Sequence, residues 1–236
     1  MSDTKPIHHT VAIAGVVQDK VSQVRLAHAL IEIISGPSTF QTRVQAQAAD
    51  PAWLRQPARI DRTWSQADGI FFFLDLPEGS YRLRVTMVDL PPQDYRLRGS
   101  LVTSPPHDYR LHTPLSQLGT RYGLFATDEK HPLQVVAPQD GKPAPIARAD
   151  VQLPPTRIHG VVTALESGEP VVGAKVRLRG DPTVISTQDD GRYELVRLVA
   201  GKPTVAVAAA GYKVATRSVS LNPGQDRMVN FKLQAI

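Results

Sequence analysis

Hydrophobic and polar residues alternate with a period of two along several short stretches of the chain. In Lys175-Val176-Arg177-Leu178 and in Tyr81-Arg82-Leu83-Arg84-Val85, the apolar or aromatic residues occupy every second position. This alternation predicts half-buried β-strands, because successive side chains of a strand point to opposite faces of the sheet. Asp68-Gly69 and Asp190-Gly191 are typical of the tight turns that open such strands. Together these patterns predict an antiparallel β-sandwich.

One hairpin occurs twice in the sequence. Ser65–Val85 and Thr187–Val207 share an Asp-Gly pair, a leucine and a turn glycine at a constant separation of 122 positions. Upstream of the hairpin, Gly15 and Gly160 begin matching Gly-Val-Val stretches at a separation of 145 positions, so the first copy contains 23 additional residues. Constant separations on both sides of one gap predict a tandem repeat of one module.

The second copy contains a longer motif, which runs through residues 158–233. It reads Gly-Val-Val, then Gly-Ala-x-Val-x-Leu, then Thr-x-x-Asp-Gly-x-Tyr-x-Leu, followed by a leucine, a turn glycine and a late Gly-Tyr. This motif resembles the carboxypeptidase regulatory-like domain, a seven-stranded transthyretin-like sandwich. The resemblance implies a fold and no catalytic residues. The matching positions are Gly160, Gly173, Val176, Leu178, Thr187, Asp190, Gly191, Tyr193, Leu195, Leu198, Gly201, Gly211 and Tyr212.

The first copy resembles a more divergent member of the same family, since it lacks the late Gly-Tyr. At the position of Tyr81, the second copy has Pro203, which favours an edge position for its strand. We therefore predict an all-β protein of two tandem seven-stranded Greek-key (transthyretin/Ig-like) sandwiches. The predicted divisions are an N-terminal arm at 1–10, a first sandwich at 11–153 with a short helical insertion near 41–62 and a long loop extension at 99–150, a stiff linker at Pro154-Pro155, and a second sandwich at 156–236.

The predicted hairpin strand of the first copy is apolar on both faces. Phe71 and Phe73 take the inward positions, and Ile70 and Phe72 occupy the alternate positions, where the second copy has charged residues. Another segment of the chain or a partner protein should therefore cover the outer face of this strand. We expect a short helix that starts near Asp50-Pro51 to place Trp53 and Leu54 over Ile70 and Phe72. The alternative cover is a partner protein.

The long loop extension contains an echo, Asp94-Tyr95-Arg96-Leu97 and Asp108-Tyr109-Arg110-Leu111, followed by Arg121-Tyr122. A loop of this length in a structural module is typical of a contact surface. The candidate partner surface consists of Ile70, Phe72, Trp53, Leu54, Tyr95, Arg96, Tyr109, Arg110, Arg121 and Tyr122.

Candidate catalytic chemistry is sparse in the sequence. There is no cysteine, and the seven histidines lack the spacing that would aim two imidazoles at one metal ion. Lys175 and Asn230 resemble the partners of an isopeptide crosslink, but the alternation turns both outward, away from the core. We expect no catalytic, cofactor or metal site. The start of the chain has neither a signal-peptide pattern nor a membrane span, so we expect a cytoplasmic protein, unless it is released as part of a particle.

These patterns favour a non-catalytic structural or adaptor protein that binds other protein subunits in a larger assembly, with self-association as an additional expectation. The paired sandwiches resemble small proteins of bacterial phage-tail-like contractile injection particles. The alternative function is a carbohydrate-binding accessory module, and an enzyme with a site between Gly99 and Asp150 is a third hypothesis. The net charge of +5 is modest for 236 residues, so we do not expect nucleic-acid binding.

Overall fold

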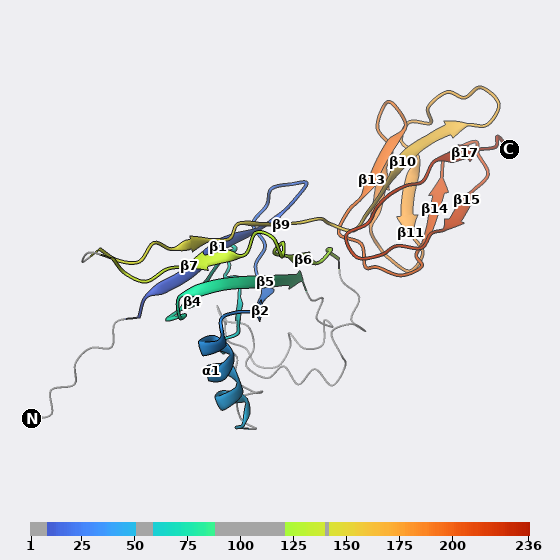
Figure 1. Ribbon diagram of the computed structural model, residues 1–236. Coiled ribbons are helices and arrows are strands. Elements are labelled where there is room, and N and C mark those ends of the chain that lie inside the picture. Colours follow the sequence, from blue (N-terminus) through green and yellow to red (C-terminus); the bar gives the residue numbers. More distant parts are fainter. Residues whose placement is uncertain (1–8, 51–58, 88–120, 140–141) are drawn as a thin grey trace, which may run out of the picture. The chain divides into compact units, whose positions relative to one another are not determined.

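The computed structural model describes residues 9–50, 59–87, 121–139 and 142–236 (Figure 1). The chain divides into a first unit, residues 1–115 and 124–153, and a second unit, residues 116–123 and 154–236. Strands account for most of the regular structure, so the predicted all-β fold is confirmed. Six of the predicted contact residues lie outside the described residues: Trp53, Leu54, Tyr95, Arg96, Tyr109 and Arg110.

The first unit contains two β-sheets and one described helix. One sheet has the order β4-β1-β8, with β9 also pairing with β1, and the other has the order β3-β2-β5-β6, with β7 also pairing with β5. The bounds are β1 Val11–Asp19, β2 Ala29–Ser35, α1 Ser38–Ala48, β3 Arg62–Trp64, β4 Ile70–Leu74, β5 Gly79–Met87, β6 Phe125–Ala126, β7 Leu133–Val135, β8 Ala147–Arg148 and β9 Val151–Leu153.

The second unit repeats this arrangement. Its sheets have the orders β13-β10-β16, with β17 also pairing with β10, and β12-β11-β14-β15. Thus β10 to β14 correspond in order and pairing to β1 to β5. The bounds are β10 Arg157–Ala164, β11 Lys175–Leu178, β12 Val184–Ser186, β13 Arg192–Leu195, β14 Thr204–Ala208, β15 Ala215–Ser218, β16 Asp226–Met228 and β17 Phe231–Leu233.

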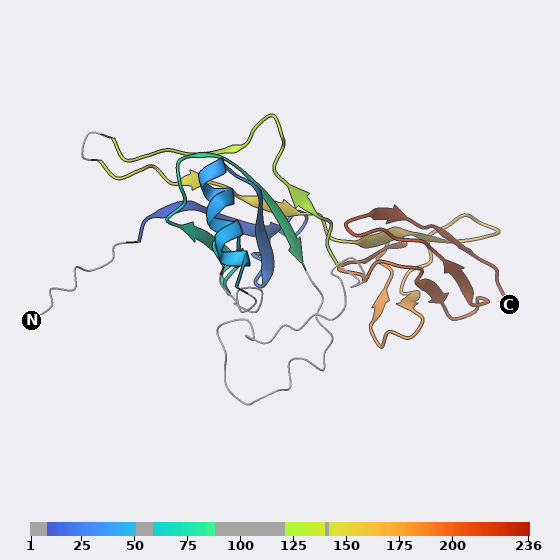
Figure 2. The same cartoon turned by 60° about the horizontal axis from the view of Figure 1, so that its bottom comes forward.

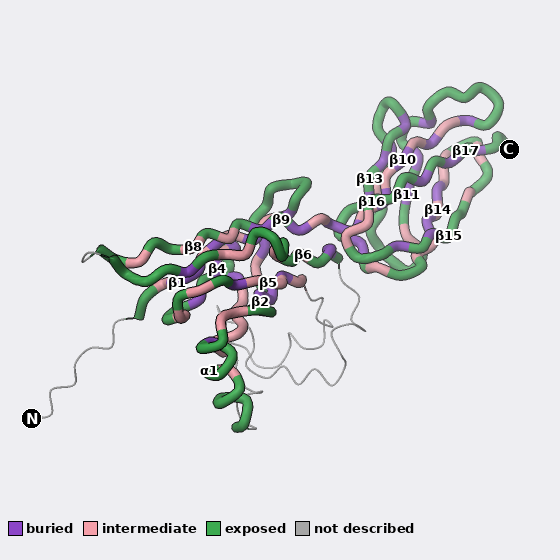
Figure 3. The backbone as a smooth tube through the Cα atoms, in the orientation of Figure 1, coloured by how far each residue is buried: buried purple, intermediate pink, exposed green. Residues whose placement is uncertain are grey.

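Burial alternates along the strands as the sequence pattern predicts (Figure 3). In β4, Phe71 and Phe73 are 0% and 3% exposed, whereas Phe72 and Leu74 are 38% and 37% exposed. The inward assignment of Phe71 and Phe73 is therefore confirmed. The outer face of β4 remains partly open to solvent at Phe72 and Leu74.

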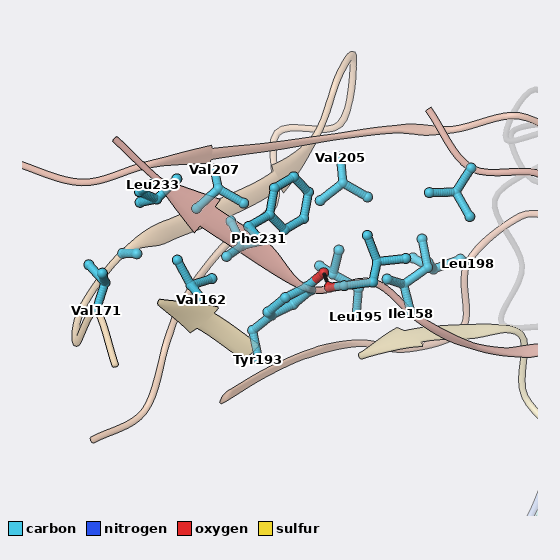
Figure 4. Close-up of a cluster of buried hydrophobic side chains, with 14 of the residues drawn as sticks. Ile158, Val162, Val171, Tyr193, Leu195, Leu198, Val205, Val207, Phe231 and Leu233 are labelled. Atoms are coloured by element: carbon cyan, nitrogen blue, oxygen red, sulfur yellow. Dashed lines mark hydrogen bonds between the residues drawn. The ribbon is translucent and has the colours of Figure 1, made fainter. Parts of the chain in front are cut away.

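The core of the second unit lies between its two sheets (Figure 4). Val207 and Val205 of β14 lie opposite Val162 of β10 and Leu195 of β13, and the Phe231 ring lies between the two valines of β14. The buried Tyr193 hydroxyl donates a hydrogen bond to the main-chain carbonyl of Val229. Burial raises the pKa of Tyr193, because the neutral phenol is preferred where water is excluded.

The edge position predicted for the strand after Pro203 is wrong. That strand, β14, lies between β11 and β15 and pairs with both. Pro203 is tolerated because it precedes the first paired residue, Thr204, so no ladder bond requires its missing N–H. Its carbonyl still accepts a bond of 3.0 Å from the Val219 N–H.

Helix α1 overlaps the start of the helical insertion predicted near 41–62 (Figure 2). The helix expected from Asp50-Pro51 falls on residues 51–58, which lie outside the described part of the chain. It is anchored by Phe40, its one buried residue, whose ring packs edge-on against Tyr81 at a centroid distance of 5.4 Å. Within the described part of the chain, no helix is both long and apolar enough to cross a membrane.

A buried hydroxyl joins neighbouring segments at the same place in each unit. In the first unit, the Ser65 hydroxyl accepts a hydrogen bond of 2.8 Å from the Ala29 N–H and donates one of 2.7 Å to the Leu26 carbonyl. One side chain thereby satisfies two buried main-chain groups, which would otherwise be left without a partner. Ser65 is only 1% exposed.

Thr187 is the equivalent residue of the second unit. Its hydroxyl accepts a bond from the Ala174 N–H and donates one to the Val171 carbonyl, at 2.9 and 2.6 Å. We expect Thr187→Val to lower the free energy of unfolding of the second unit by about 1–3 kcal/mol, because two buried polar groups lose their partner. Chemical denaturation of the full chain measures this loss. The control, Thr216→Val on the exposed face of β15, should stay within about 0.5 kcal/mol of wild type; equal losses in both variants would contradict the assignment.

Candidate partner-binding grooves

The first unit has a groove of about 580 Å³ between α1 and the β3–β4 side of the sandwich. We call it the first groove. Helix α1 forms one wall, and the exposed outer positions of β4, Phe72 and Leu74, contribute apolar surface opposite. The full lining consists of His9, Phe40, Arg43, Ala46, Gln47, Arg59, Ile60, Arg62, Thr63 and residues 72–77.

Charged groups at the first groove are engaged in local interactions. Arg59 and Asp61 form a bidentate ion pair at 2.8 and 2.6 Å. At the other end, His9 Nδ1 lies 2.5 Å from an Asp75 carboxylate oxygen, and Arg43 donates to the Asp75 carbonyl. The hydrogen bond from His9 holds the pKa of Asp75 below its usual value, helped by the Thr10 N–H. These contacts hold the charged side chains at the rim in place. The apolar surface of Phe72 and Leu74 is then what a partner can reach.

Two shifted pKa values near the first groove have structural causes. Burial lowers the pKa of Arg62, and the neighbouring Arg59 adds to this effect, while Asp61 opposes it. Burial also raises the pKa of Tyr81 to about 12. Its hydroxyl donates a bond of 2.7 Å to the Pro77 carbonyl, so this phenol positions the turn after β4 rather than facing a substrate.

The second unit has its own groove, of about 640 Å³, which we call the second groove. Its walls are the turn between β11 and β12 and the turn between β13 and β14. Leucines at the edge of the core, Leu178, Leu195 and Leu198, form the apolar floor. The full lining consists of Arg121, residues 178–183, Ile185, residues 194–200, Lys202 and Pro203.

The two grooves occupy equivalent positions in the two units. Segments 59–63 and 72–77 contribute to the first groove, and segments 181–185 and 194–199, each 122 positions later, contribute to the second. The strand pairing supports this correspondence, since Thr63 pairs with Ile31 as Ile185 pairs with Val176. The repeat therefore carries a recess in the same corner of each sandwich, and α1 is an added wall in the first unit.

Two of the four predicted contact residues that the structure describes line a groove. Phe72 lines the first groove, while Ile70 is half-buried on the same outer face, opposite Val16. Arg121 lines the second groove.

Tyr122 does not belong to an exposed surface, and its assignment must be corrected. It is 5% exposed and bridges to Pro155, while Gly123 and Arg121 exchange main-chain bonds with Pro154 and Thr156. This long-range pairing buries Tyr122. It also places residues 121–123 in the second unit, although the sequence pattern assigned them to the first.

Lys175 and Asn230 have separate partners. Lys175 donates to the Ser186 hydroxyl, and the Asn230 side-chain oxygen accepts from the Val161 N–H. Both residues are exposed, as the alternation predicted. Across the described ranges of the chain, no group of three or more His, Asp or Glu side chains is arranged to hold a metal ion.

The grooves themselves could not be found from the sequence pattern. Each is lined by segments that are distant in sequence, and alternation along one strand cannot show how two turns face each other. The repeat offered one usable signal, because a surface found in one copy is expected at the equivalent residues of the other.

A search with protein-family models assigns the second unit. Residues 157–234 match the carboxypeptidase regulatory-like domain. The matched residues contain the second groove except for Arg121, which precedes them in sequence. The match agrees with the resemblance found in the sequence motif. No curated protein matches the chain.

The comparison with solved structures gives distant matches. The shaft pilin SpaA from Lactobacillus rhamnosus GG aligns with a TM-score of 0.38 and 10% identity, covering 97% of both chains. A streptococcal ancillary pilin aligns at 0.32 and 14% identity, covering 100% of this chain and 64% of its own. A type II cohesin–X-dockerin complex from Acetivibrio cellulolyticus aligns at 0.30 and 19% identity, covering 34% of this chain and 58% of its own. The present chain thus spans little more than half of that protein, and the similarity is too distant to transfer a role.

We expect the side chain of Phe40 to hold α1 in place as a wall of the first groove. We expect Phe40→Ala to cost about 3–5 kcal/mol, because it removes a buried ring packed against Tyr81. Hydrogen exchange of residues 38–48 should accelerate more than that of β13 in the second unit. Gln45→Ala, at an exposed position of α1, is the control and should leave exchange unchanged. Unchanged exchange in Phe40→Ala would show that other contacts hold the helix.

Proposed function

We propose that this chain is a non-catalytic structural or adaptor component that binds other protein subunits within a larger assembly. The observation that supports this proposal most directly is the pair of equivalent grooves with accessible apolar surface. In the first groove, Phe72 and Leu74 are more than a third exposed on one strand face. Partly exposed apolar groups gathered in a recess favour binding of a partner side chain, because burial removes them from water.

The chemistry of the groove walls favours binding over catalysis. In an active site, the catalytic side chains point toward one substrate position, and their pKa values are shifted to suit the proton transfer or nucleophilic attack that they perform. Here the acidic side chains near the first groove, Asp61 and Asp75, are held by Arg59 and His9 in local pairs. The raised pKa of Tyr81 accompanies a bond to a main-chain carbonyl. These interactions stabilise the walls.

The small number of exposed aromatic side chains also favours a protein partner over a glycan. A carbohydrate-binding accessory module needs exposed aromatic platforms. Among the described residues, Phe72 is the sole aromatic in the set of exposed large apolar side chains. The other phenylalanines that line this groove, Phe40 and Phe73, are only 4% and 3% exposed, so they offer a sugar ring no platform.

The assembly that we propose is a bacterial phage-tail-like contractile injection particle, with this chain present in the cytoplasm before incorporation. This finer proposal rests on the resemblance of the paired sandwiches to small proteins of such particles. Self-association of the chain is an alternative use of the same surfaces, and the experiment below distinguishes it.

Capture from native cells tests the proposed function. We expect the tagged full-length chain to recover partner subunits in stoichiometric amounts, with particles visible by negative-stain microscopy. Phe72→Glu should reduce recovery about 30-fold or more, because a charge replaces an apolar anchor at the level of an interface hot spot. Mass spectrometry quantifies the recovery, and circular dichroism checks folding.

Val24→Glu provides the control, since Val24 is an exposed apolar residue of the first unit outside the groove. It should leave recovery at the wild-type level. Leu74→Ser provides a milder groove variant that is expected to weaken recovery without adding charge. Elution of the wild-type chain alone, as a monomer or as a homo-oligomer, would sink the proposal, and so would full recovery with both groove variants.

A further inference from the structure

We propose that the second groove binds an acidic segment of a partner protein, with an apolar side chain of that segment in contact with the groove floor. This inference rests on the proposed function and names the chemistry of one partner. It follows from the distribution of charge over the two units, the state of the individual charged side chains, and a comparison of equivalent positions in the repeat.

The net charge of the protein resides in the second unit. Residues 116–123 and 154–236 contain twelve Lys and Arg against seven Asp and Glu, a net charge of +5, which equals that of the whole chain. The first unit is therefore neutral. A charge confined to one unit gives that unit a positive field, which attracts and orients anionic partners.

Two cationic side chains at the second groove are available for a partner. Arg179 and Lys202 are exposed, and the described residues provide neither with a side-chain partner. The two carboxylates at this groove are already engaged. Asp181 accepts a bond of 2.8 Å from the Thr183 N–H, and Glu194 pairs with Arg157 at 2.8 Å.

The hydrogen bond that Asp181 accepts also changes the pKa of its carboxyl group. The hydrogen bond from Thr183 holds the pKa of Asp181 below its usual value, and the nearby Arg121 contributes in the same direction. Asp181 therefore stays negatively charged, and the lining carries four cationic side chains, Arg121, Arg179, Arg197 and Lys202, against two carboxylates, Asp181 and Glu194.

The first unit serves as an internal reference for this charge. At the positions of Arg179 and Lys202 it has Ile34 and Ser80, and at the position of Arg197 it has Asp75. The same strand order forms in both units, so the fold does not require cations at these positions.

The outer face of β11 shows the same contrast. In the first unit, Glu32 and Arg84 are cross-strand neighbours and form a salt bridge at 2.8 Å. In the second unit, the equivalent pair is Arg177 and Ala206, so the arginine has no carboxylate opposite it. At this pair the second unit has a cation where the first unit has the carboxylate Glu32.

The floor of the second groove determines the class of anionic partner. Val196 and Val199 are both 46% exposed, and Leu178 and Leu198 reach the core beneath them. Nucleic acid is bound by basic grooves that also offer aromatic rings for base stacking. The residues described as lining this groove include no aromatic side chain. An acidic peptide with interspersed leucines matches both the rim and the floor.

The test uses the full chain and a fluorescein-labelled ten-residue peptide that alternates Asp or Glu with Leu. Fluorescence anisotropy measures its dissociation constant at two salt concentrations. We expect saturable binding that weakens as salt rises, because exposed charges are screened beyond about 10 Å at 0.1 M. The matched peptide with Asn and Gln in place of Asp and Glu should bind about tenfold more weakly or worse.

Variants locate the binding. The double variant Arg179→Glu with Lys202→Glu should weaken the acidic peptide about tenfold or more, because two attractions become repulsions. Arg227→Glu with Lys232→Glu makes the same change of net charge at exposed positions outside the groove. This control should stay within about twofold of wild type, since distant exposed charges contribute little. Val199→Ser should also weaken binding, through loss of floor contact.

Several outcomes would overturn the inference. Equal losses in the two double variants would show attraction to net charge without a site. Equal affinity for the neutral peptide would remove the role of the cations. Tighter binding of a labelled ten-nucleotide oligothymidine, with the same sensitivity to Arg179 and Lys202, would assign the groove to nucleic acid. If subunits are still captured in stoichiometric amounts while the acidic peptide fails to bind, only this inference fails and the proposed function stands.

Discussion

In each unit, the terminal segment passes directly over one glycine of the unit's first strand, and this close contact constrains the packing of the two segments. A Cβ atom on Gly15 would lie 2.0 Å from the Ala149 carbonyl oxygen, and one on Gly160 would lie 2.0 Å from that of Val229. No other residue fits, because real Cβ contacts are not that short. At this point Asp150 and Asn230 each accept a hydrogen bond from the residue after the glycine. The glycine allows this close approach, and on either side of it β1 and β10 pair in parallel with their terminal strands.

That constraint reaches the grooves through the neighbouring strand. Gly160 pairs with Tyr193 and His159 pairs with Glu194 in β13, so the position of β10 sets the position of the groove wall. The turn that follows has the same backbone in both units. Asp75 and Arg197 both have positive φ, at 53° and 57°. The two recesses therefore share a backbone framework that is held from within.

The sequence predicts this framework well because its signals are local. Alternation of period two identified Phe71 and Phe73 as inward residues, and the repeat identified the hairpin in both copies. The errors arose where distant segments meet. The burial of Tyr122 depends on pairing with residue 155, and the central position of β14 depends on a partner strand beyond Pro203. The grooves were invisible for the same reason, since each lies between turns that only the tertiary structure brings together.

The residues that hold the framework and those that line the rims have different freedom to change. Glycine contacts and buried hydroxyls admit few substitutions, whereas exposed side chains change at a cost within about 0.5 kcal/mol. Phe72 corresponds to Glu194, and Asp75 to Arg197, on the same backbone. Because stability does not dictate these rim residues, we expect their chemistry to follow the partner proposed for each groove. The first unit is neutral and exposes a phenylalanine, whereas the second unit is basic and exposes cations. The two units are therefore suited to different partner segments, and this one protein can bind both.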